Sequence, residues 1–414
     1  MVKHKEKRTI KVVVVDDDPL ILETISLYLK GDRFKLITVS DSATAFDLIL
    51  ENRPDLVLVD LIMPGVDGLK LCKQIKTHED LADTKFIMIS AKIYEFDEKR
   101  SYEFGADGYL IKPFQPQQLI NRIDAVLEDK ITMTFWGVRG TLPVPGEKSL
   151  KYGGNTSCVS LEFPKKQFFI FDAGSGIKNL GNSLIERNLR RLRAKIFISH
   201  PHWDHINAIP FFAPLYTQGS DIEVLGANQG DVTMRELISA QMDGVYFPIT
   251  LSEFAARVYF RDLEEETIEV DGIEVKTKLL SHPGKCLGYR VNYQGRSICY
   301  ITDNEFFPRD NTSHNAHYEK KLIEFCEGAD ALIPDCTYTD EEYKAHVGWG
   351  HSSVSKVAEF AHTANVKALY LFHHDPDQDD NDIDNKLSEA ESVLKGLSSS
   401  TIVIAPKEGD HFKL

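Results

Sequence analysis

Short apolar segments alternate with amphipathic segments over the first third of the chain. Residues 12–15, 56–59, 86–89 and 109–111 are apolar and rich in β-branched residues, which is typical of strands covered on both faces of a parallel sheet. Residues 34–39 add a further strand, and the segments between strands carry apolar residues at helical spacing. The pattern predicts five β-α units, a flavodoxin-like α/β domain with five parallel strands, over residues 1–129.

Polar residues mark the carboxyl ends of these strands. Asp16 and Asp17 follow the first strand, Asp60 follows the third, Ser90 follows the fourth, and Lys112 comes directly after the fifth. The carboxyl ends of parallel strands meet at one edge of such a sheet, so these side chains are expected to converge. Three neighbouring carboxylates repel one another unless a hard cation lies among them, and Mg²⁺ prefers oxygen ligands. A magnesium site is therefore expected at this edge.

Four segments of this domain, VVVVDDDP, PDLVLVDLIMPGVDG, ISAK and GADGYLIKPF, resemble the response-regulator receiver family. The resemblance covers about residues 10–128 and implies that Asp60 accepts a phosphoryl group from a histidine kinase or a phosphotransfer protein. It also implies that Asp16, Asp17 and the backbone carbonyl of Ile62 help Asp60 to hold Mg²⁺. A carboxylate is a workable nucleophile toward a metal-bound phosphoryl group, which agrees with this role of Asp60.

The same resemblance assigns three further receiver residues. Ser90 and Lys112 would bind the phosphoryl oxygens, and Tyr109 would be the aromatic residue that reorients together with Ser90. No Gly/Ser-rich or Pro-rich linker separates this domain from the strand predicted over residues 132–136. Because a short junction can transmit a change of receiver shape, phosphorylation of Asp60 is expected to alter the activity of the second domain. The sign of that effect and the formation of a homodimer stay open.

A cluster of potential metal ligands follows an apolar strand over residues 196–198. His200 and His202 are two residues apart in the segment SHPHWDH, and Asp204 and His205 follow them directly. Two imidazoles can bind one metal while the other two side chains turn to a second, and distant loops must then supply the remaining ligands. Three further candidates each follow an apolar strand downstream: His282, Asp303 and His373.

The segments FWGVRGTLPVPG, YGGNTSC, FDAGSG and SHPHWDH resemble the metallo-β-lactamase-fold hydrolase superfamily. Within it, they are similar to the phosphodiesterase branch that includes RNase Z, cyclic-phosphate hydrolases and certain cyclic-nucleotide phosphodiesterases. The resemblance covers residues 130–414 and implies an αββα sandwich with two metals at one edge. It implies a first metal held by His200, His202, His282 and Asp303. It implies a second metal, which Asp303 would bridge to the first, held by Asp204, His205, Asp303 and His373.

Matching motifs imply three further assignments. His351, in GWGHSSV, stands where this branch has a histidine that is not a metal ligand but protonates the leaving oxygen. Asp172, in DAGSG, stands at a turn where it would support a ligand rather than bind metal. His373 is preferred over His374 because it matches the family's pattern of a strand followed by a histidine. The expected catalytic residues are His351, Asp204 and Asp303.

The ligand types bear on the metal and the reaction. Zinc suits the imidazole-rich set best, while the aspartates leave manganese or iron open. Di-iron oxidoreductases of the same fold usually have a glutamate where His202 stands, so His202 favours hydrolysis. Two metals that activate water and bind phosphoryl oxygens would cleave a phosphodiester.

The charge balance bears on the substrate. Acidic residues number 63 and basic residues 48, and the net charge of −15 argues against binding of extended nucleic acid by counterion release. RNase Z has a long basic arm for tRNA, and no comparable Gly/Pro-rich basic insertion occurs here. A small phosphodiester such as a cyclic nucleotide is therefore expected. Two alternatives stay open, an RNase Z-like endonuclease and a non-catalytic, metal-bound sensor or docking platform.

Cysteine usage and hydropathy bear on the cellular compartment. The six cysteines are scattered without a C-x-x-C pair, which favours reduced core thiols over a disulfide framework. The apolar run after the basic start is too short for a secretory signal, and no run approaches 18 apolar residues. The expected location is the cytoplasm, without a membrane partner.

Overall fold

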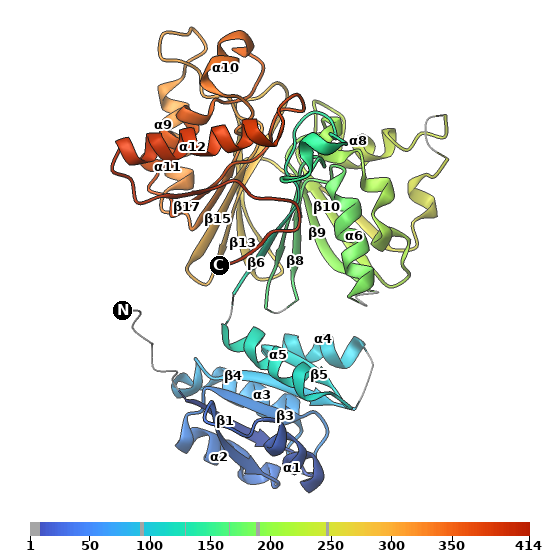
Figure 1. The fold of residues 1–414 in the computed structure, drawn as a ribbon. Helices are drawn as coiled ribbons and strands as arrows, with labels where there is room; N and C mark the ends of the chain where they lie inside the picture. The colour runs from blue at the N-terminus through green and yellow to red at the C-terminus, as the bar shows by residue number, and fades with distance from the viewer. Residues whose placement is uncertain (1–8, 92–94, 129, 165, 188–190, 246–247) are drawn as a thin grey trace. The chain divides into compact units, whose positions relative to one another are not determined.

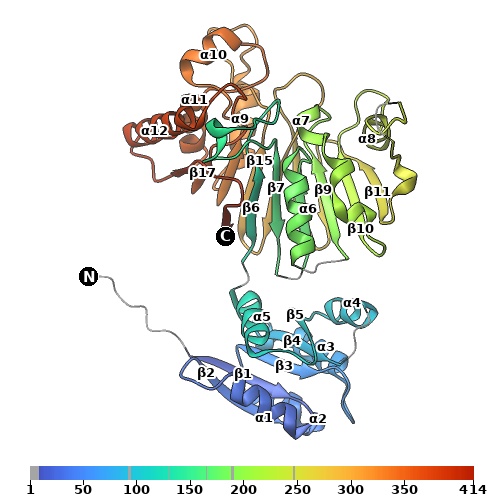
Figure 2. The same ribbon diagram turned by 45° about the vertical axis from the view of Figure 1, so that its right-hand side comes forward.

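The chain divides into two compact units, one over Met1–Ile131 and Phe163–Lys166 and the other over Thr132–Glu162 and Gln167–Leu414. The computed structural model describes residues 9–414 except 92–94, 129, 165, 188–190 and 246–247, and Figures 1 and 2 show it from two sides. Residue 129, the last that the sequence assigns to the first domain, lies outside the described residues.

The first unit contains a five-stranded sheet in the order β2-β1-β3-β4-β5, with every neighbouring pair parallel. This arrangement confirms the predicted flavodoxin-like class. Its strands are β1 (Ile10–Val15), β2 (Phe34–Val39), β3 (Leu56–Asp60), β4 (Lys85–Ser90) and β5 (Gly108–Ile111). Its helices are α1 (Pro19–Tyr28), α2 (Ser42–Asn52), α3 (Gly68–Thr77), α4 (Glu95–Glu103) and α5 (Pro116–Glu128), with a 3₁₀ turn over Glu79–Leu81.

Strand β1 of this sheet is buried on both faces. Val12 packs in one apolar cluster with Ile25 of α1 and Ile123 of α5, while its neighbour Val13 packs in another with Ile49 of α2. Alternate residues of a strand point to opposite faces, so a continuous apolar run is what a strand between two helical layers requires.

The second unit contains two seven-stranded sheets within the described residues. The first has the order β11-β10-β9-β8-β7-β6-β19, and the second has the order β12-β13-β14-β15-β16-β17-β18. The strands of the first sheet are β6 (Thr132–Gly137), β7 (Cys158–Glu162), β8 (Phe168–Phe171), β9 (Arg193–Ile198), β10 (Asp221–Gly226), β11 (Arg257–Asp262) and β19 (His411–Lys413). Those of the second are β12 (Thr267–Val270), β13 (Ile273–Leu279), β14 (Leu287–Tyr293), β15 (Arg296–Ile301), β16 (Ala331–Pro334), β17 (Ala368–Tyr370) and β18 (Ile402–Ile404).

Helices cover the outer faces of both sheets (Figure 1). Ile177 and Leu180 of α6 pack on the first sheet, while Leu322 of α9, Val357 of α11 and Leu394 of α12 pack on the second. This layering confirms the predicted αββα sandwich. The helices of this unit are α6 (Gly176–Glu186), α7 (Trp203–Ile206), α8 (Met234–Ala240), α9 (Ala316–Cys326), α10 (Asp340–His346), α11 (Val354–Thr363) and α12 (Asp380–Gly396). Its 3₁₀ turns are Glu147–Ser149, Ile209–Phe211, Ala213–Tyr216 and Leu251–Glu253.

Aromatic side chains join the inner faces of the two sheets. Phe171 of β8 and Phe197 of β9 stack with ring centroids 5.3 Å apart, and Tyr289 of β14 lies 5.3 Å from Phe197. Tyr300 of β15 lies 5.3 Å from Phe171. The hydroxyl of Tyr289 donates a hydrogen bond of 2.6 Å to the carbonyl of Ile198, at the end of β9. Because Ser199 and His200 follow this carbonyl directly, the core fixes the point at which the chain enters the histidine-rich segment.

None of the helices formed by the described residues combines the length and the apolarity that a membrane-spanning helix needs.

We expect Tyr289→Phe to lower the free energy of unfolding of the second unit by about 1 kcal/mol, because the carbonyl of Ile198 loses a buried donor while the ring is kept. Urea denaturation of the full chain measures the change. The matched control is Tyr259→Phe, whose side chain is half exposed on β11 and whose loss of a hydroxyl should matter by less than about 0.5 kcal/mol. Equal effects of the two variants would contradict the expectation.

Candidate functional sites

The carboxyl ends of β1, β3 and β5 meet around one lysine in the first unit. Lys112 Nζ donates hydrogen bonds to Asp16 Oδ2 at 2.7 Å and to Asp60 Oδ1 at 2.5 Å. Asp60 Oδ2 accepts a hydrogen bond of 2.7 Å from the backbone N–H of Ile62. Burial raises the pKa of Asp16, although its bond with Lys112 acts in the opposite direction. Asp16 and Asp60 are buried, whereas Asp17 is exposed, so the pair of carboxylates lies at the floor of a site that opens at Asp17.

Two more receiver residues lie at the neighbouring strand ends. Ser90 is the last residue of β4, Tyr109 belongs to β5, and both side chains are buried. A hydrogen bond joins the two side chains. Burial raises the pKa of Tyr109, and the hydrogen bond with Ser90 acts in the opposite direction. The structure therefore places these side chains as a pair.

In the second unit, four predicted ligands from three segments form one group. His200, His202, His282 and Asp303 each offer a ligand atom, and these atoms all lie within 4.8 Å of one another. Asp303 Oδ2 lies 3.5 Å from His200 Nε2 and 3.8 Å from His282 Nε2. His282 Nε2 also lies 3.3 Å from His202 Nδ1. His202 is the exposed member of this group, so the group is open to solvent on that side.

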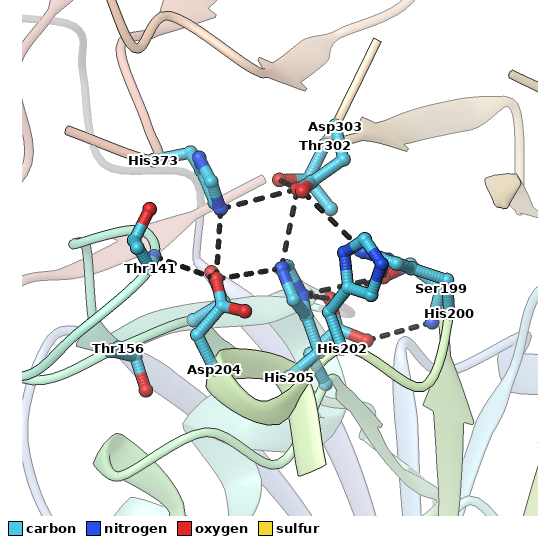
Figure 3. Close-up of polar contacts among 12 residues, drawn as sticks. Thr141, Thr156, Ser199, His200, His202, Asp204, His205, Thr302, Asp303 and His373 are labelled. Atoms are coloured by element: carbon cyan, nitrogen blue, oxygen red, sulfur yellow. Dashed lines mark hydrogen bonds and ion pairs between the residues drawn. The ribbon is translucent and has the colours of Figure 1, made fainter. Parts of the chain in front are cut away.

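A second group lies against the other oxygen of the same aspartate (Figure 3). Asp204, His205 and His373 offer atoms within 4.8 Å of one another, and all three residues are buried. Asp303 Oδ1 lies 3.3 Å from His205 Nε2 and 3.2 Å from His373 Nε2. Asp204 Oδ2 lies 3.0 Å and 3.2 Å from the same two nitrogens. Asp303 therefore stands between the two groups and faces each with one carboxylate oxygen.

Hydrogen bonds on the far side of the rings aim them into the cluster. His205 Nδ1 lies 2.7 Å from Asp172 Oδ2, which also accepts a hydrogen bond of 2.7 Å from the hydroxyl of Tyr300. His282 Nδ1 lies 3.0 Å from the carbonyl of Gly350. When a carboxylate or a carbonyl accepts the proton of Nδ1, Nε2 keeps its lone pair, which is the arrangement that metal-bound histidines require. Asp172 thus contacts the ring of a predicted ligand.

Two ring nitrogens of this cluster lack a hydrogen-bond partner within the described part of the protein. His200 Nε2 and His205 Nε2 are buried and have no hydrogen-bond partner among the described residues. His205 Nε2 is close to Asp204, as given above, but outside hydrogen-bond geometry. Buried polar atoms are rarely left in this state in folded proteins. The cluster brings imidazole nitrogens and carboxylate oxygens together, and two of these nitrogens are buried without a hydrogen-bond partner among the described residues. Such a set of ligand atoms fits divalent cations.

The charge state of the cluster also fits cation binding. Burial lowers the pKa of His200, His202 and His282, which favours their neutral, metal-binding forms. Burial alone would raise the pKa of Asp303, but the neighbouring histidines, His373 first among them, hold it well below the ordinary value. Metal ligands must be deprotonated before they bind, so these four directions favour a metal site. For His205, burial lowers the pKa, but nearby carboxylates outweigh burial and raise it well above the ordinary value, so a bound cation would have to replace that proton.

His351 has a carboxylate partner that the sequence did not single out. His351 Nδ1 lies 2.6 Å from Asp335 Oδ2, and Asp335 is almost fully buried directly after β16. Burial by itself lowers the pKa of His351, but the charge and the hydrogen bond of Asp335 outweigh burial and raise the pKa to about 9. The ring of His351 stacks on that of His373 at 5.1 Å. Asp335 could have been found, because it follows an apolar strand just as Asp303 does.

The structure also separates His373 from its neighbour. His373 points into the cluster, and its Nδ1 lies 3.0 Å from the hydroxyl of Thr337. His374 is fully buried, and neither of its ring nitrogens has a partner among the described residues. Its backbone N–H donates to the carbonyl of Val138, and its carbonyl accepts from Gly140. Of the two histidines, His373 is the one that faces the other ligand candidates.

We expect Asp335→Asn to lower the pKa of His351 from about 9 toward the ordinary value for histidine, because the neutral amide removes the charge that outweighs burial. Titration of the histidine ring signals by NMR in chelator-treated protein measures the change. Asp377→Asn, at an exposed position, is the control and should leave the pKa of His351 unaltered. A pKa that stays near 9 without Asp335 would refute this account.

Comparisons with known proteins agree with the two units. The family described as "Response regulator receiver domain" matches residues 12–124, and the family described as "Beta-lactamase superfamily domain" matches residues 168–374, which is half of the chain. The DNA-binding response regulator MtrA of Mycolicibacterium smegmatis is 30% identical over 202 residues, which cover 45% of this chain and 87% of that protein.

Solved structures resemble the second unit in fold. The metallo-beta-lactamase fold protein YhfI from Bacillus subtilis has a TM-score of 0.52 and 17% identity, covering 69% of this chain and 100% of that one. Human tRNase Z, short form, has a TM-score of 0.44 and 22% identity, covering 68% of this chain and 98% of that one. A fold of this kind implies divalent metal binding, and a receiver domain implies a phosphodonor partner such as a histidine kinase. The chain therefore belongs to the beta-lactamase superfamily through its C-terminal unit and to the response-regulator receiver family through its N-terminal unit.

Proposed function

We propose that the C-terminal unit is a di-metal phosphodiesterase that hydrolyses a small phosphodiester such as a cyclic nucleotide, and that phosphorylation of Asp60 controls it. The observation that carries the hydrolase proposal is the position of Asp303, whose two carboxylate oxygens face two separate groups of histidines. A carboxylate in this position can bridge two cations, and paired divalent cations are a recurring arrangement in enzymes that cleave phosphate esters.

The ligands of each cation follow from the two groups. The first metal would be held by His200, His202, His282 and Asp303, and the second by Asp204, His205, Asp303 and His373. The imidazole-rich set suits zinc, and manganese or iron would also accept these donors. When bound, the cations would supply Lewis-acid chemistry, namely the activation of water and the neutralisation of charge on the phosphoryl oxygens.

His351 would deliver the proton that the leaving group needs. Its Nδ1 is engaged by Asp335, so Nε2 carries the proton that can be transferred. In the protein without cations, a pKa of about 9 keeps the ring protonated at neutral pH, and a departing alkoxide is basic enough to take that proton. General-acid catalysis of this kind contributes about 10²- to 10⁴-fold in rate. Asp335 would therefore hold the proton donor in both its orientation and its charged state.

The charge of the chain supports a small substrate over an extended nucleic acid. The net charge of −15 repels long polyanions, which bind mainly through the release of counterions from many phosphates. A single phosphodiester requires only the local positive charge that the cations would provide. We therefore favour a small phosphodiester over the substrate of an RNase Z-like endonuclease.

We expect the full chain to hydrolyse bis-p-nitrophenyl phosphate with added Zn²⁺ or Mn²⁺. His202→Ala and Asp303→Ala should each lower kcat/KM by roughly 100-fold or more, because each removes a metal-binding atom. His317→Ala, at an exposed position on α9, is the matched control and should retain activity. Metal content, measured by mass spectrometry, should fall in parallel with activity. Bound metal without turnover of any phosphodiester would favour the non-catalytic sensor or docking platform.

The first unit would act as the phosphorylation-dependent regulator. Asp60 would accept the phosphoryl group from a histidine kinase or a phosphotransfer protein, and Mg²⁺ would be held by Asp60, Asp16, Asp17 and the backbone carbonyl of Ile62. The contacts of Lys112 with Asp16 and Asp60 support this assignment, since the ammonium group lies where charge would develop on the phosphoryl oxygens. Ser90 would bind the same oxygens, and its hydrogen bond with Tyr109 offers a route by which both side chains reorient together.

We expect acetyl phosphate with Mg²⁺ to change kcat/KM of the wild-type chain by about 5-fold or more in one direction, which corresponds to a coupling free energy of at least 1 kcal/mol. Asp60→Asn should abolish the response while leaving the activity without acetyl phosphate intact. Asp67→Asn provides a control at a half-buried helix N-cap in the same unit. Identical activity of treated wild type, untreated wild type and Asp60→Asn would defeat the regulatory proposal.

A further inference from the structure

Two of the three tryptophans in the chain are exposed beside the metal-ligand cluster. Trp203 is 81% exposed and Trp349 is 62% exposed. Trp203 stands between the candidate ligands His202 and Asp204, and Trp349 stands two residues before His351. Single exposed apolar residues are common on protein surfaces. Two exposed indoles at the edge of one site are less easily explained by chance, because tryptophan offers the largest apolar area that a ligand can bury.

The two segments that carry these tryptophans meet at the exposed side of the cluster. His202 Nδ1 lies 3.3 Å from His282 Nε2, and His282 Nδ1 lies 3.0 Å from the carbonyl of Gly350. Trp203 directly follows His202, and Trp349 directly precedes Gly350. The ring of His282 therefore lies between the side chain of His202, which precedes one tryptophan, and the backbone of Gly350, which follows the other. Figure 2 shows α7, which begins at Trp203, and α10, which ends three residues before Trp349, at the same edge of the sandwich.

The backbone around Trp349 is held in place by a buried carboxylate. Glu305 Oε1 accepts a hydrogen bond of 2.7 Å from the N–H of Gly348, and Glu305 Oε2 accepts one of 2.8 Å from the N–H of Gly350. The N–H of Trp349 donates to the carbonyl of His346, whose ring also meets the indole edge-on at 4.8 Å. The indole is thus exposed but anchored, which lowers the entropy cost of binding a ligand.

The backbone around Trp203 is equally fixed. Trp203 is the first residue of α7, and its carbonyl accepts a hydrogen bond of 2.7 Å from the N–H of Asn207. Asp204, the next residue, is buried, and its Oδ2 accepts a hydrogen bond of 2.8 Å from the N–H of Thr141. The residue after Thr141 is Leu142, a third apolar side chain that is more than half exposed. An apolar rim therefore borders a cluster of charged and imidazole groups.

We propose that Trp203 and Trp349 form an aromatic subsite that binds the nucleobase of a nucleotide whose phosphate lies at the histidine and aspartate cluster. The inference rests on the proposed function in one respect, that the cluster takes a phosphate group. Stacking of a base on an aromatic side chain contributes about 1–3 kcal/mol. A flat indole face matches a flat heterocycle, so this subsite selects phosphodiesters that carry a base over aliphatic ones.

A matched pair of ligands tests the subsite. AMP and ribose 5-phosphate share the sugar and the phosphate, and only AMP has a base. Isothermal titration calorimetry with the full chain, both chelator-treated and loaded with Zn²⁺, should show tighter binding of AMP than of ribose 5-phosphate in both states. Trp203→Ala and Trp349→Ala should each weaken AMP binding by about 5-fold or more and leave ribose 5-phosphate binding within about twofold of wild type. The phenylalanine variants at both positions, which keep a flat ring, should recover most of the lost affinity.

Tyr259→Ala is the control, because it removes an exposed aromatic ring from β11 at the edge of the sheet. Equal affinity of the wild type for AMP and ribose 5-phosphate would overturn the inference, as would equal loss of both ligands in the tryptophan variants. Failure of the proposed hydrolase is distinguished by a separate measurement. If base-dependent binding persists while no phosphodiester is cleaved, the aromatic subsite stands and the catalytic proposal fails.

Discussion

The carboxylate of Asp303 imposes the main constraint on the second unit. It is nearly fully buried and lies 3.2–3.8 Å from four imidazoles, which come from the ends of β9, β13 and β17 or from the loops that follow them. A buried charge is costly unless it is paired, and neutral imidazoles do not pair it. The buried charge of Asp303 is therefore compensated only if cations or protons occupy the space between these side chains. Two sheets must end at the same edge to bring the residues together, so the sandwich and the site depend on each other.

The backbone is strained at this edge. Asp172, Asp303 and His373 have φ angles of +57°, +53° and +61°, although none of them is a glycine. The left-handed conformation costs an ordinary residue about 1–2 kcal/mol, and such strain persists where the surrounding structure over-determines it. Each of the three lies within three residues of a strand end, where the sheet fixes the direction of the chain. Glycine would relieve the strain but would remove a side chain that faces the cluster or supports it. At these three positions, the strained backbone therefore coincides with side chains that face the cluster or support it.

Much of this architecture follows from patterns that are local in the sequence. The apolar runs predicted the receiver strands because a parallel strand that is covered on both faces consists mostly of apolar residues. The segment from His200 to His205 stands out because four potential ligands fall within six residues. Glu305 and the pairing of Asp335 with His351 were missed because the partners are distant in the chain, although the place of Asp335 after an apolar strand is visible in the sequence. Asp335 contacts His351, 16 residues away, and Glu305 binds the backbone of Gly348 and Gly350, more than 40 residues away. Contacts of this kind depend on register and loop path, which composition and periodicity do not encode. The exposure of Trp203 likewise becomes visible only after folding.

Asp335 also connects the proton donor to the second ligand group. Its Oδ2 engages His351, while its Oδ1 accepts hydrogen bonds from the N–H of Thr337 at 2.9 Å and from the hydroxyl of Thr337 at 2.7 Å. With its proton directed to Asp335, that hydroxyl can accept the Nδ1 proton of His373, which leaves His373 Nε2 with its lone pair toward Asp204 and Asp303. One carboxylate at the end of β16 therefore orients both a candidate general acid and a candidate metal ligand. Because the two rings also stack on each other, a displacement of this strand end would misplace both groups at once. The chemistry of the site thus depends on how well β16 is held between β15 and β17 in the core of the second sheet.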